Sequence, residues 1–191
     1  QNWSASGGDI SQTGNRYVFA YQPTLTFSST SFSKIYGADG AAALANAYAV
    51  SGYEPAVSGV YLADSATTAW SGLPTLTSAG SATSAGVGGS PYGISVAAGT
   101  LSSSAGYALA FSSSGQLTVT PAPLTIIADD VTKSYDGLAF SGGGGLHYAG
   151  FVNGDTQASL SGSLLWSGTA QGARDAGSYG IAASGLANPN Y

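Results

Sequence analysis

The sequence contains no cysteine and no methionine among its 191 residues. Without cysteine the chain can form neither a disulfide nor a cysteine-ligated metal site, and it has no thiol chemistry. Charged side chains are also scarce, at 7% of residues against roughly 25% in an average globular protein. Only four residues are basic and the formal net charge is −5, so there is no positive surface for a phosphate backbone. We therefore expect no nucleic-acid binding and no attraction to an anionic membrane surface.

Long hydrophobic runs are missing as well. No apolar stretch approaches the ~18 residues that a membrane-spanning helix needs, so we expect no membrane insertion. The first residues, "QNWSASGGDIS", have neither a basic start nor an apolar segment, and they do not have the pattern of a signal peptide. If the protein is secreted, we expect that signal to be removed or to lie outside this chain.

The residues that are abundant favour strands over helices. Glycine occurs 29 times, and serine and threonine are frequent; all three weaken helix interiors. The alanine-rich segment 40–50 is the one candidate for a helix. Segments rich in alternating, β-branched or aromatic residues recur between turn signals, which predicts a mainly β fold with little helix. These segments are 16–22, 24–29, 90–99, 107–112, 116–121, 124–129, 161–168 and 177–185.

A short motif occurs twice and contains the only two lysines of the chain. The two lysines lie 99 positions apart (133 − 34). A lysine stem can lie along a tyrosine ring while its ammonium group reaches carbonyl oxygens or an acid. We interpret both motifs as structural ties at the start of a repeated module. Their residues are Lys34, Tyr36 and Gly37 in "SKIYGADG", and Lys133, Tyr135, Asp136 and Gly137 in "TKSYDGLA".

The sequence after each motif also matches, which indicates an internal repeat. Tyr92 of "SPYGISVAAGTL" corresponds to Tyr179 of "GSYGIAASGL", and Tyr107 corresponds to Tyr191. We therefore predict two tandem small β modules, 23–120 and 121–191, the second without its last strand. An immunoglobulin-like sandwich and a β-grasp-like module both fit this order of strands, and the sequence leaves both open.

The first 22 residues are interpreted as the terminal strand of a preceding or partner repeat. A module without its last strand exposes unpaired backbone, which a strand from another copy can fill. Such strand donation runs head to tail and builds an open filament. The candidate donor residues are Arg16, Tyr17, Val18, Phe19, Ala20 and Tyr21.

Several phrases together resemble a known family. "LTVTPAPLTIIADDVTKSYDG", "GFVNGDT", "GSYGI" and "LANPNY" are similar to the MBG/YDG-type repeats of large secreted bacterial adhesins and filamentous-haemagglutinin-like exoproteins. The match is good over 120–191 and looser over 24–120, where the aspartate of Tyr-Asp-Gly is missing. The resemblance implies a mainly β spacer module of surface-exposed stalks or fibres. It carries over no catalytic residue and no cofactor.

Candidates for chemistry are few. His147 is the only histidine, so a two-histidine metal site cannot form, and no G-x-S-x-G nucleophile motif is present. Loop carboxylates at Asp129, Asp130 and Asp155 are weak candidates for calcium ligands. The alternative is that they are solvated turn residues, because "VNGDT" is a favourable turn with an aspartate cap. We expect no enzymatic activity, no metal and no cofactor.

Two functional hypotheses remain. The first is a structural stalk module of a secreted or bacterial cell-surface adhesin, whose partners are neighbouring repeats or other copies of itself. The second is a binding module for a host glycan or a surface protein, because 12 tyrosines and three tryptophans provide flat faces for stacking. Tyrosines at matched repeat positions are interpreted as structural, and Trp3, Tyr53 and Tyr61 are the better ligand-binding candidates.

Overall fold

The computed structural model describes residues 2–3, 18–19, 21–56, 58 and 62–191, and it is mostly β with about 10% helix. The mainly β prediction is confirmed. Among the described residues, every helix is too short or too polar to cross a membrane. The chain folds into two compact units. The first comprises the described residues up to Lys34, Asp39–Ala82 and Gly89–Thr118; the second comprises Ile35–Ala38, Thr83–Gly88 and Val119–Tyr191.

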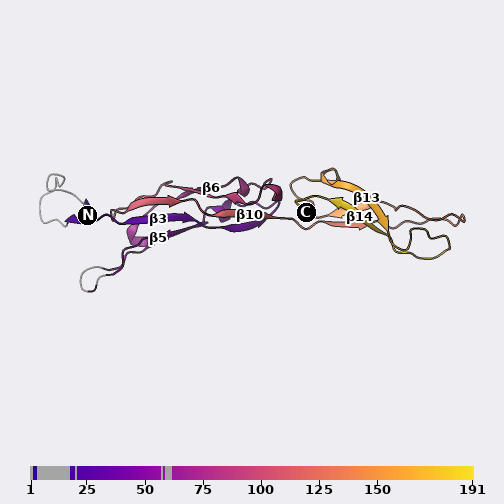
Figure 1. The fold of residues 1–191 in the computed structure, drawn as a ribbon, viewed down its shortest axis with the longest axis horizontal. Helices are drawn as coiled ribbons and strands as arrows, with labels where there is room; N and C mark the ends of the chain where they lie inside the picture. The colour runs from indigo at the N-terminus through magenta and orange to yellow at the C-terminus, as the bar shows by residue number, and fades with distance from the viewer. Residues whose placement is uncertain (1, 4–17, 20, 57, 59–61) are drawn as a thin grey trace. The chain divides into compact units, whose positions relative to one another are not determined.

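Strand β3 (Thr24–Ser29) is the central strand of the first unit (Figure 1). It pairs antiparallel with β5 (Tyr48–Ser51) and in parallel with β9 (Ala108–Ser112). Its residues alternate between buried and more exposed positions, because successive side chains of a strand point to opposite faces. Leu25 and Phe27 lie on the buried face and have no exposed surface.

The core of the first unit forms around this face. Phe27 packs edge-on against Trp70, with ring centroids 5.2 Å apart and an interplanar angle of 81°. Ala69, Val96 and Tyr107 complete the buried cluster. Burial of aromatic and aliphatic side chains of this kind is the main stabilising contribution, at about 1.5–3 kcal/mol for each fully buried large side chain.

The other elements that precede β11 (Thr125–Ala128) in the chain are short. One sheet has the order β4–β10–β7, and β6 pairs antiparallel with β8. Their bounds are β4 (Phe32–Ile35), β6 (Thr75–Thr77), β7 (Tyr92–Gly93), β8 (Ser95–Ala97) and β10 (Gln116–Thr120). The helical turns are α1 (Ala41–Leu44), α2 (Ala66–Ala69), η2 (Ala79–Ser81) and η3 (Val87–Gly89).

The segment 40–50 is only partly helical. Helix α1 is one turn long, and Tyr48–Ser51 belongs to strand β5. The second half of the segment pairs with β3 as a strand, because in this conformation Tyr48 and Val50 pack against the buried cluster of the first unit. Tertiary packing thus overrides the helix propensity of alanine.

The second unit contains two antiparallel strand pairs (Figure 1). Strand β11 (Thr125–Ala128) pairs with β12 (Leu146–Ala149), and β13 (Ser161–Ser167) pairs with β14 (Ala182–Ala187). The 3-10 turn η4 (Gln157–Ser159) precedes β13. Within the part of the chain that the structure describes, β11 has a strand partner on one edge only, whereas β3 has one on both.

An aromatic row runs through the second unit. The ring centroids of Tyr36 and Tyr191 are 5.7 Å apart, those of Tyr191 and Phe151 are 5.5 Å apart, and those of Phe151 and Tyr148 are 5.5 Å apart. The first two contacts are edge-to-face, which is a preferred geometry for aromatic pairs.

Candidate functional site

The second unit holds a half-buried tyrosine against an aspartate. The hydroxyl of Tyr191 donates to Oδ2 of Asp155 at 2.8 Å and accepts from the backbone N–H of Val152 at 3.1 Å. The hydroxyl of Ser159 donates to Oδ1 of the same aspartate at 3.1 Å. We call Tyr191, Asp155, Val152 and Ser159 the second clasp.

The first unit repeats this arrangement with different residues. The hydroxyl of Tyr107 donates to Oδ2 of Asp64 at 2.5 Å and accepts from the backbone N–H of Glu54 at 2.9 Å. The hydroxyl of Thr68 donates to Oδ1 of Asp64 at 3.4 Å. These four residues are called the first clasp.

Each clasp aspartate directly precedes a helix start. Ser65 caps α2 and forms a capping box with Thr68, while Thr156 caps η4 and forms one with Ser159. Serine and threonine are favoured at this position because their side chains accept from free backbone N–H groups of the first turn. The capping residue therefore fixes where the aspartate before it points, and the last residue of each box also reaches the carboxylate.

The strands in front of the clasps have corresponding registers. Thr26 of β3 lies opposite Ser51, and Thr125 of β11 lies opposite Ala149. A positive-φ glycine follows each second strand, at Gly52 and Gly150. Because the two chain segments follow the same course, the backbone N–H groups of Glu54 and Val152 take the same position and each donates to a tyrosine hydroxyl.

The hydrogen bonds change the acidity of the clasp residues. The pKa of Asp155 is lowered, first by the hydrogen bond from Tyr191 and then by those from Tyr36 and Ser159, against the opposing effect of burial. Burial raises the pKa of Tyr191, and the bond to the Asp155 carboxylate adds to it. Burial likewise raises the pKa of Tyr107, with the bond to Asp64 as the next cause. The raised pKa values keep both tyrosine hydroxyls protonated, so each can donate a hydrogen bond to its aspartate.

Tyr36, from the first copy of the sequence motif, is a further donor in the second clasp. Its hydroxyl donates to Oδ2 of Asp155 at 3.0 Å, and its ring meets Tyr191 at an interplanar angle of 87°. Only 7% of its surface is exposed. Gly37 has a φ of +86°, and a side chain there would collide with Val152, 2.5 Å from an added Cβ. The Tyr36–Gly37 pair therefore allows the loop Ile35–Ala38 to lie directly on the clasp.

Lys34 is buried at the base of the same loop. Its ammonium group donates to the backbone oxygen of Ala82, and burial lowers its pKa while the charge of Asp39 opposes that shift. A buried ammonium group needs such partners, because an unpaired charge away from water is costly.

The second copy of the motif has a different environment. The ammonium group of Lys133 pairs with Asp136 and also donates to the carbonyl of Leu138 at 3.0 Å. The hydrogen bond from Lys133 is the first cause of the lowered pKa of Asp136. Gly137 has a φ of +75°, and no atom lies within 4 Å of an added Cβ. Tyr135 is 74% exposed.

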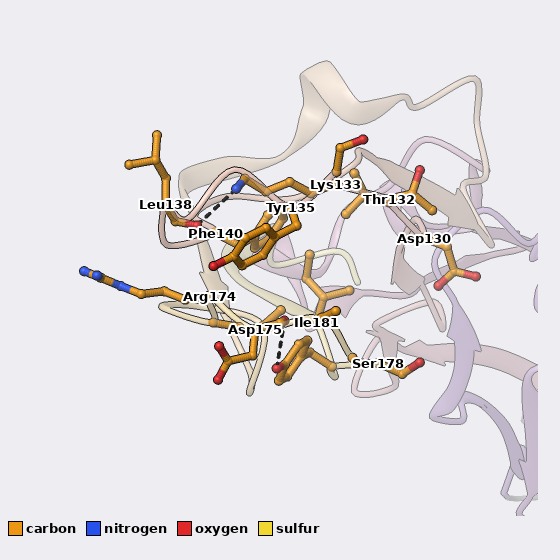
Figure 2. A pocket seen from close by; sticks show the side chains of 17 residues that line it. Asp130, Thr132, Lys133, Tyr135, Leu138, Phe140, Arg174, Asp175, Ser178 and Ile181 are labelled. Atoms are coloured by element: carbon orange, nitrogen blue, oxygen red, sulfur yellow. Dashed lines mark hydrogen bonds between the residues drawn. The ribbon is translucent and has the colours of Figure 1, made fainter.

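Tyr135 lines a cavity of about 500 Å³ in the second unit (Figure 2). Tyr179, Phe140 and Ile181 contribute apolar surface to it, and Arg174 lies at its margin. The hydroxyl of Tyr179 donates to the backbone oxygen of Asp175 at 3.1 Å, which fixes that ring. Such a cavity offers two tyrosine rings to a ligand or a partner surface.

The weak calcium candidates do not gather in the structure. Asp129 contacts Nδ1 of His147, Asp155 belongs to the second clasp, and Asp130 lines the cavity. Across the described residues, no group of three or more His, Cys, Asp or Glu side chains is arranged to hold a metal ion.

Half of the predicted donor segment, namely Arg16, Tyr17 and Ala20, lies outside the described residues. Val18 and Phe19 form β2 (Val18–Phe19), which pairs in parallel with β1 (Asn2–Trp3) of the same chain. Tyr21 is exposed.

Comparison with known proteins gives one family. The family model described as MBG domain (YGX type) matches residues 124–191. This stretch is an MBG domain. MBG domains are repeat modules of adhesin-like extracellular proteins. No curated protein and no solved structure matches the chain.

The matched residues 124–191 contain Asp155, Tyr191 and the second motif, whereas Tyr36, which completes the clasp, lies outside them. Sequence reasoning matched Tyr107 with Tyr191 but missed the correspondence of Asp64 with Asp155. The signal for it was present: each aspartate is followed by a Ser or Thr capping residue, in "ADSATT" and "GDTQAS".

Proposed function

We propose that this chain is a structural repeat module of a bacterial cell-surface or secreted adhesin and that it has no catalytic activity. The observation that carries the proposal is the clasp, built twice in one chain with the same donors, acceptors and capping turn. Its tyrosines and aspartates are used in holding the fold. A repeat whose contacts are mostly to its neighbours is suited to a spacer.

The composition supports the same role. Low charge limits charge-driven association, and without cysteine and methionine the chain has no sulfur side chain that can be oxidised. The prolines of "TPAP" between β10 and β11 favour an extended path. Both properties suit a module held away from a cell surface.

The test uses fusions of one, two and three complete chains. Small-angle scattering should show a maximum dimension that grows by a similar increment with each added copy. A three-copy protein no longer than the two-copy protein would reject the spacer function.

The finer part of the proposal is assembly by strand addition. Strand β3 has the parallel partner β9, and in the described part of the chain β11 has no equivalent partner. A strand from another copy, with residues 16–21 as the donor, would pair with this edge. Deleting residues 1–22 should abolish concentration-dependent light scattering by the chain; unchanged scattering would count against strand donation.

The cavity beside Tyr135 and Tyr179 favours one alternative, a binding module for a host glycan or surface protein. Stacking of a sugar on these rings would shift the NMR signals of both tyrosines in a titration with oligosaccharides. The same titration of a Tyr179→Phe/Tyr135→Ala variant is the control. Saturable shifts in the parent chain alone would favour the binding module.

A further inference from the structure

The two copies of the Lys-x-Tyr motif share their sequence but differ in what surrounds their tyrosines. Tyr36 is 7% exposed and donates to Asp155, whereas Tyr135 is 74% exposed. Among the described residues, no group forms a hydrogen bond with the hydroxyl of Tyr135. Tyr135 therefore has the position in its motif, but not the contacts, of a residue that packs on a clasp.

The second clasp shows what receives such a tyrosine. Oδ2 of Asp155 accepts the hydroxyl hydrogen of Tyr36. The Tyr36 ring meets the Tyr191 ring edge to face, and Gly37 lies against Val152. The loop that provides Tyr36 and Gly37 belongs to the second unit although it lies far before it in the chain. The MBG domain is thus completed by a motif loop from outside residues 124–191.

The first clasp has the same receiving groups. Asp64 corresponds to Asp155, Tyr107 to Tyr191 and Glu54 to Val152, as their matching hydrogen bonds show. Asp64 is partly exposed, and carboxylates accept more than one hydrogen bond. A tyrosine hydroxyl bound to a carboxylate is a charge-assisted hydrogen bond and roughly twice as strong as a neutral one.

We propose that the loop 132–138 docks on the first clasp of a second copy of this chain, where Tyr135 donates its hydroxyl hydrogen to Asp64. The second copy follows the first in this arrangement, as Asp155 follows Tyr36 within the chain. The proposal rests on the proposed repeat function and names the residues that join one copy to the next. Lys133 and Asp136 hold the loop in shape through their ion pair, so docking needs little further ordering.

The experiment uses two complete chains fused end to end, because fusion raises the effective concentration of the partner surface to the millimolar range. One fusion keeps Tyr135 in the first copy and carries Tyr135→Phe in the second; the matched fusion has the reverse. Nitration of the remaining Tyr135 by tetranitromethane is followed by peptide mass spectrometry. The buried Tyr148 hydroxyl, in the same tryptic peptide, is the internal reference.

Tyr135 of the first copy should be nitrated at least about five-fold more slowly than Tyr135 of the second copy, which corresponds to a docked population of about four fifths. An Asp64→Asn substitution in the second copy should restore fast nitration, because the charge-assisted acceptor is lost. Asp39→Asn in the second copy is the matched charge control and should leave the protection in place. Circular dichroism of each fusion checks that its fold is intact.

Equal nitration rates in the two matched fusions would overturn the docking proposal. Protection that persists in the Asp64→Asn fusion would overturn the role of Asp64. Neither result bears on the spacer function, which depends on how the dimensions of one-, two- and three-copy proteins increase.

Discussion

Tyr36 and Tyr191 donate to the same oxygen of Asp155, at 3.0 and 2.8 Å, and their rings meet edge to face. The Asp155 carboxylate thus accepts one hydrogen bond from Tyr191, at the end of the matched residues 124–191, and one from a motif loop that lies well before residue 124. The boundary of the folded unit therefore differs from the stretch that the family model matches. The stability of the MBG domain should depend on a residue outside its sequence.

Removing the hydroxyl of Tyr36 tests this dependence. Tyr36→Phe should lower the free energy of unfolding of the second unit by about 1 kcal/mol, the typical contribution of one hydrogen bond. Amide hydrogen exchange in β13 and β14 measures the loss locally. Tyr135→Phe is the matched control and should change exchange there by less than about 0.5 kcal/mol, as exposed substitutions do. Equal effects of the two variants would contradict the assignment of Tyr36 to the clasp.

Acid should weaken the second clasp. An aspartate whose pKa is lowered on folding stabilises the folded state at pH values above its ordinary pKa of 3.8. This stabilisation is lost as the pH falls from 3.8 through the lowered value. Thermal unfolding of the second unit should therefore become less dependent on pH below 4 in Asp155→Asn than in the parent chain. Asp175→Asn removes the same formal charge elsewhere in that unit and is the matched control for the loss of charge alone.

Alkali should weaken both clasps. The pKa of Tyr107 and that of Tyr191 are raised on folding, so their contribution is complete below the ordinary value of 10.0 and is lost as the pH rises through the raised values. Tyrosinate absorbance at high pH should lose one late-titrating group in Tyr107→Phe and another in Tyr191→Phe, each compared with the parent chain. A titration curve whose high-pH part is unchanged by both substitutions would contradict the donor role of these two hydroxyls.

Gly143, in the glycine run 142–145, lies directly against a tryptophan ring. An added Cβ at Gly143 would lie 2.3 Å from the ring of Trp166, which leaves no room for a side chain. Gly143→Ala should lower the free energy of unfolding by about 1–3 kcal/mol, as overpacking does. Gly88→Ala is the control, because no atom lies within 4 Å of an added Cβ there. Urea unfolding of both variants compares them, and equal midpoints would contradict the contact.

The strands could be predicted because their cause is local. Segments such as 24–29 and 116–121 alternate apolar and polar residues, and they form strands β3 and β10. This alternation predicts a strand because it places the apolar residues on one face and the polar residues on the other. The clasp was harder to predict. The hydrogen bond between Tyr107 and Asp64 joins residues 43 positions apart. It forms only because the capped turn α2 points the Asp64 carboxylate toward Tyr107. A motif repeated in sequence also gives no sign that Tyr36 is buried and Tyr135 exposed, since burial depends on what packs against each loop.

The most direct test of the account is a pair of double-mutant cycles, one in each unit. Tyr107→Phe with Asp64→Asn, and Tyr191→Phe with Asp155→Asn, measure how strongly each tyrosine and aspartate depend on one another. Equilibrium unfolding should give favourable coupling free energies for both pairs, with the same sign and similar size. If one pair is coupled and the effects of the other simply add, the two units are not copies of one clasp-built module.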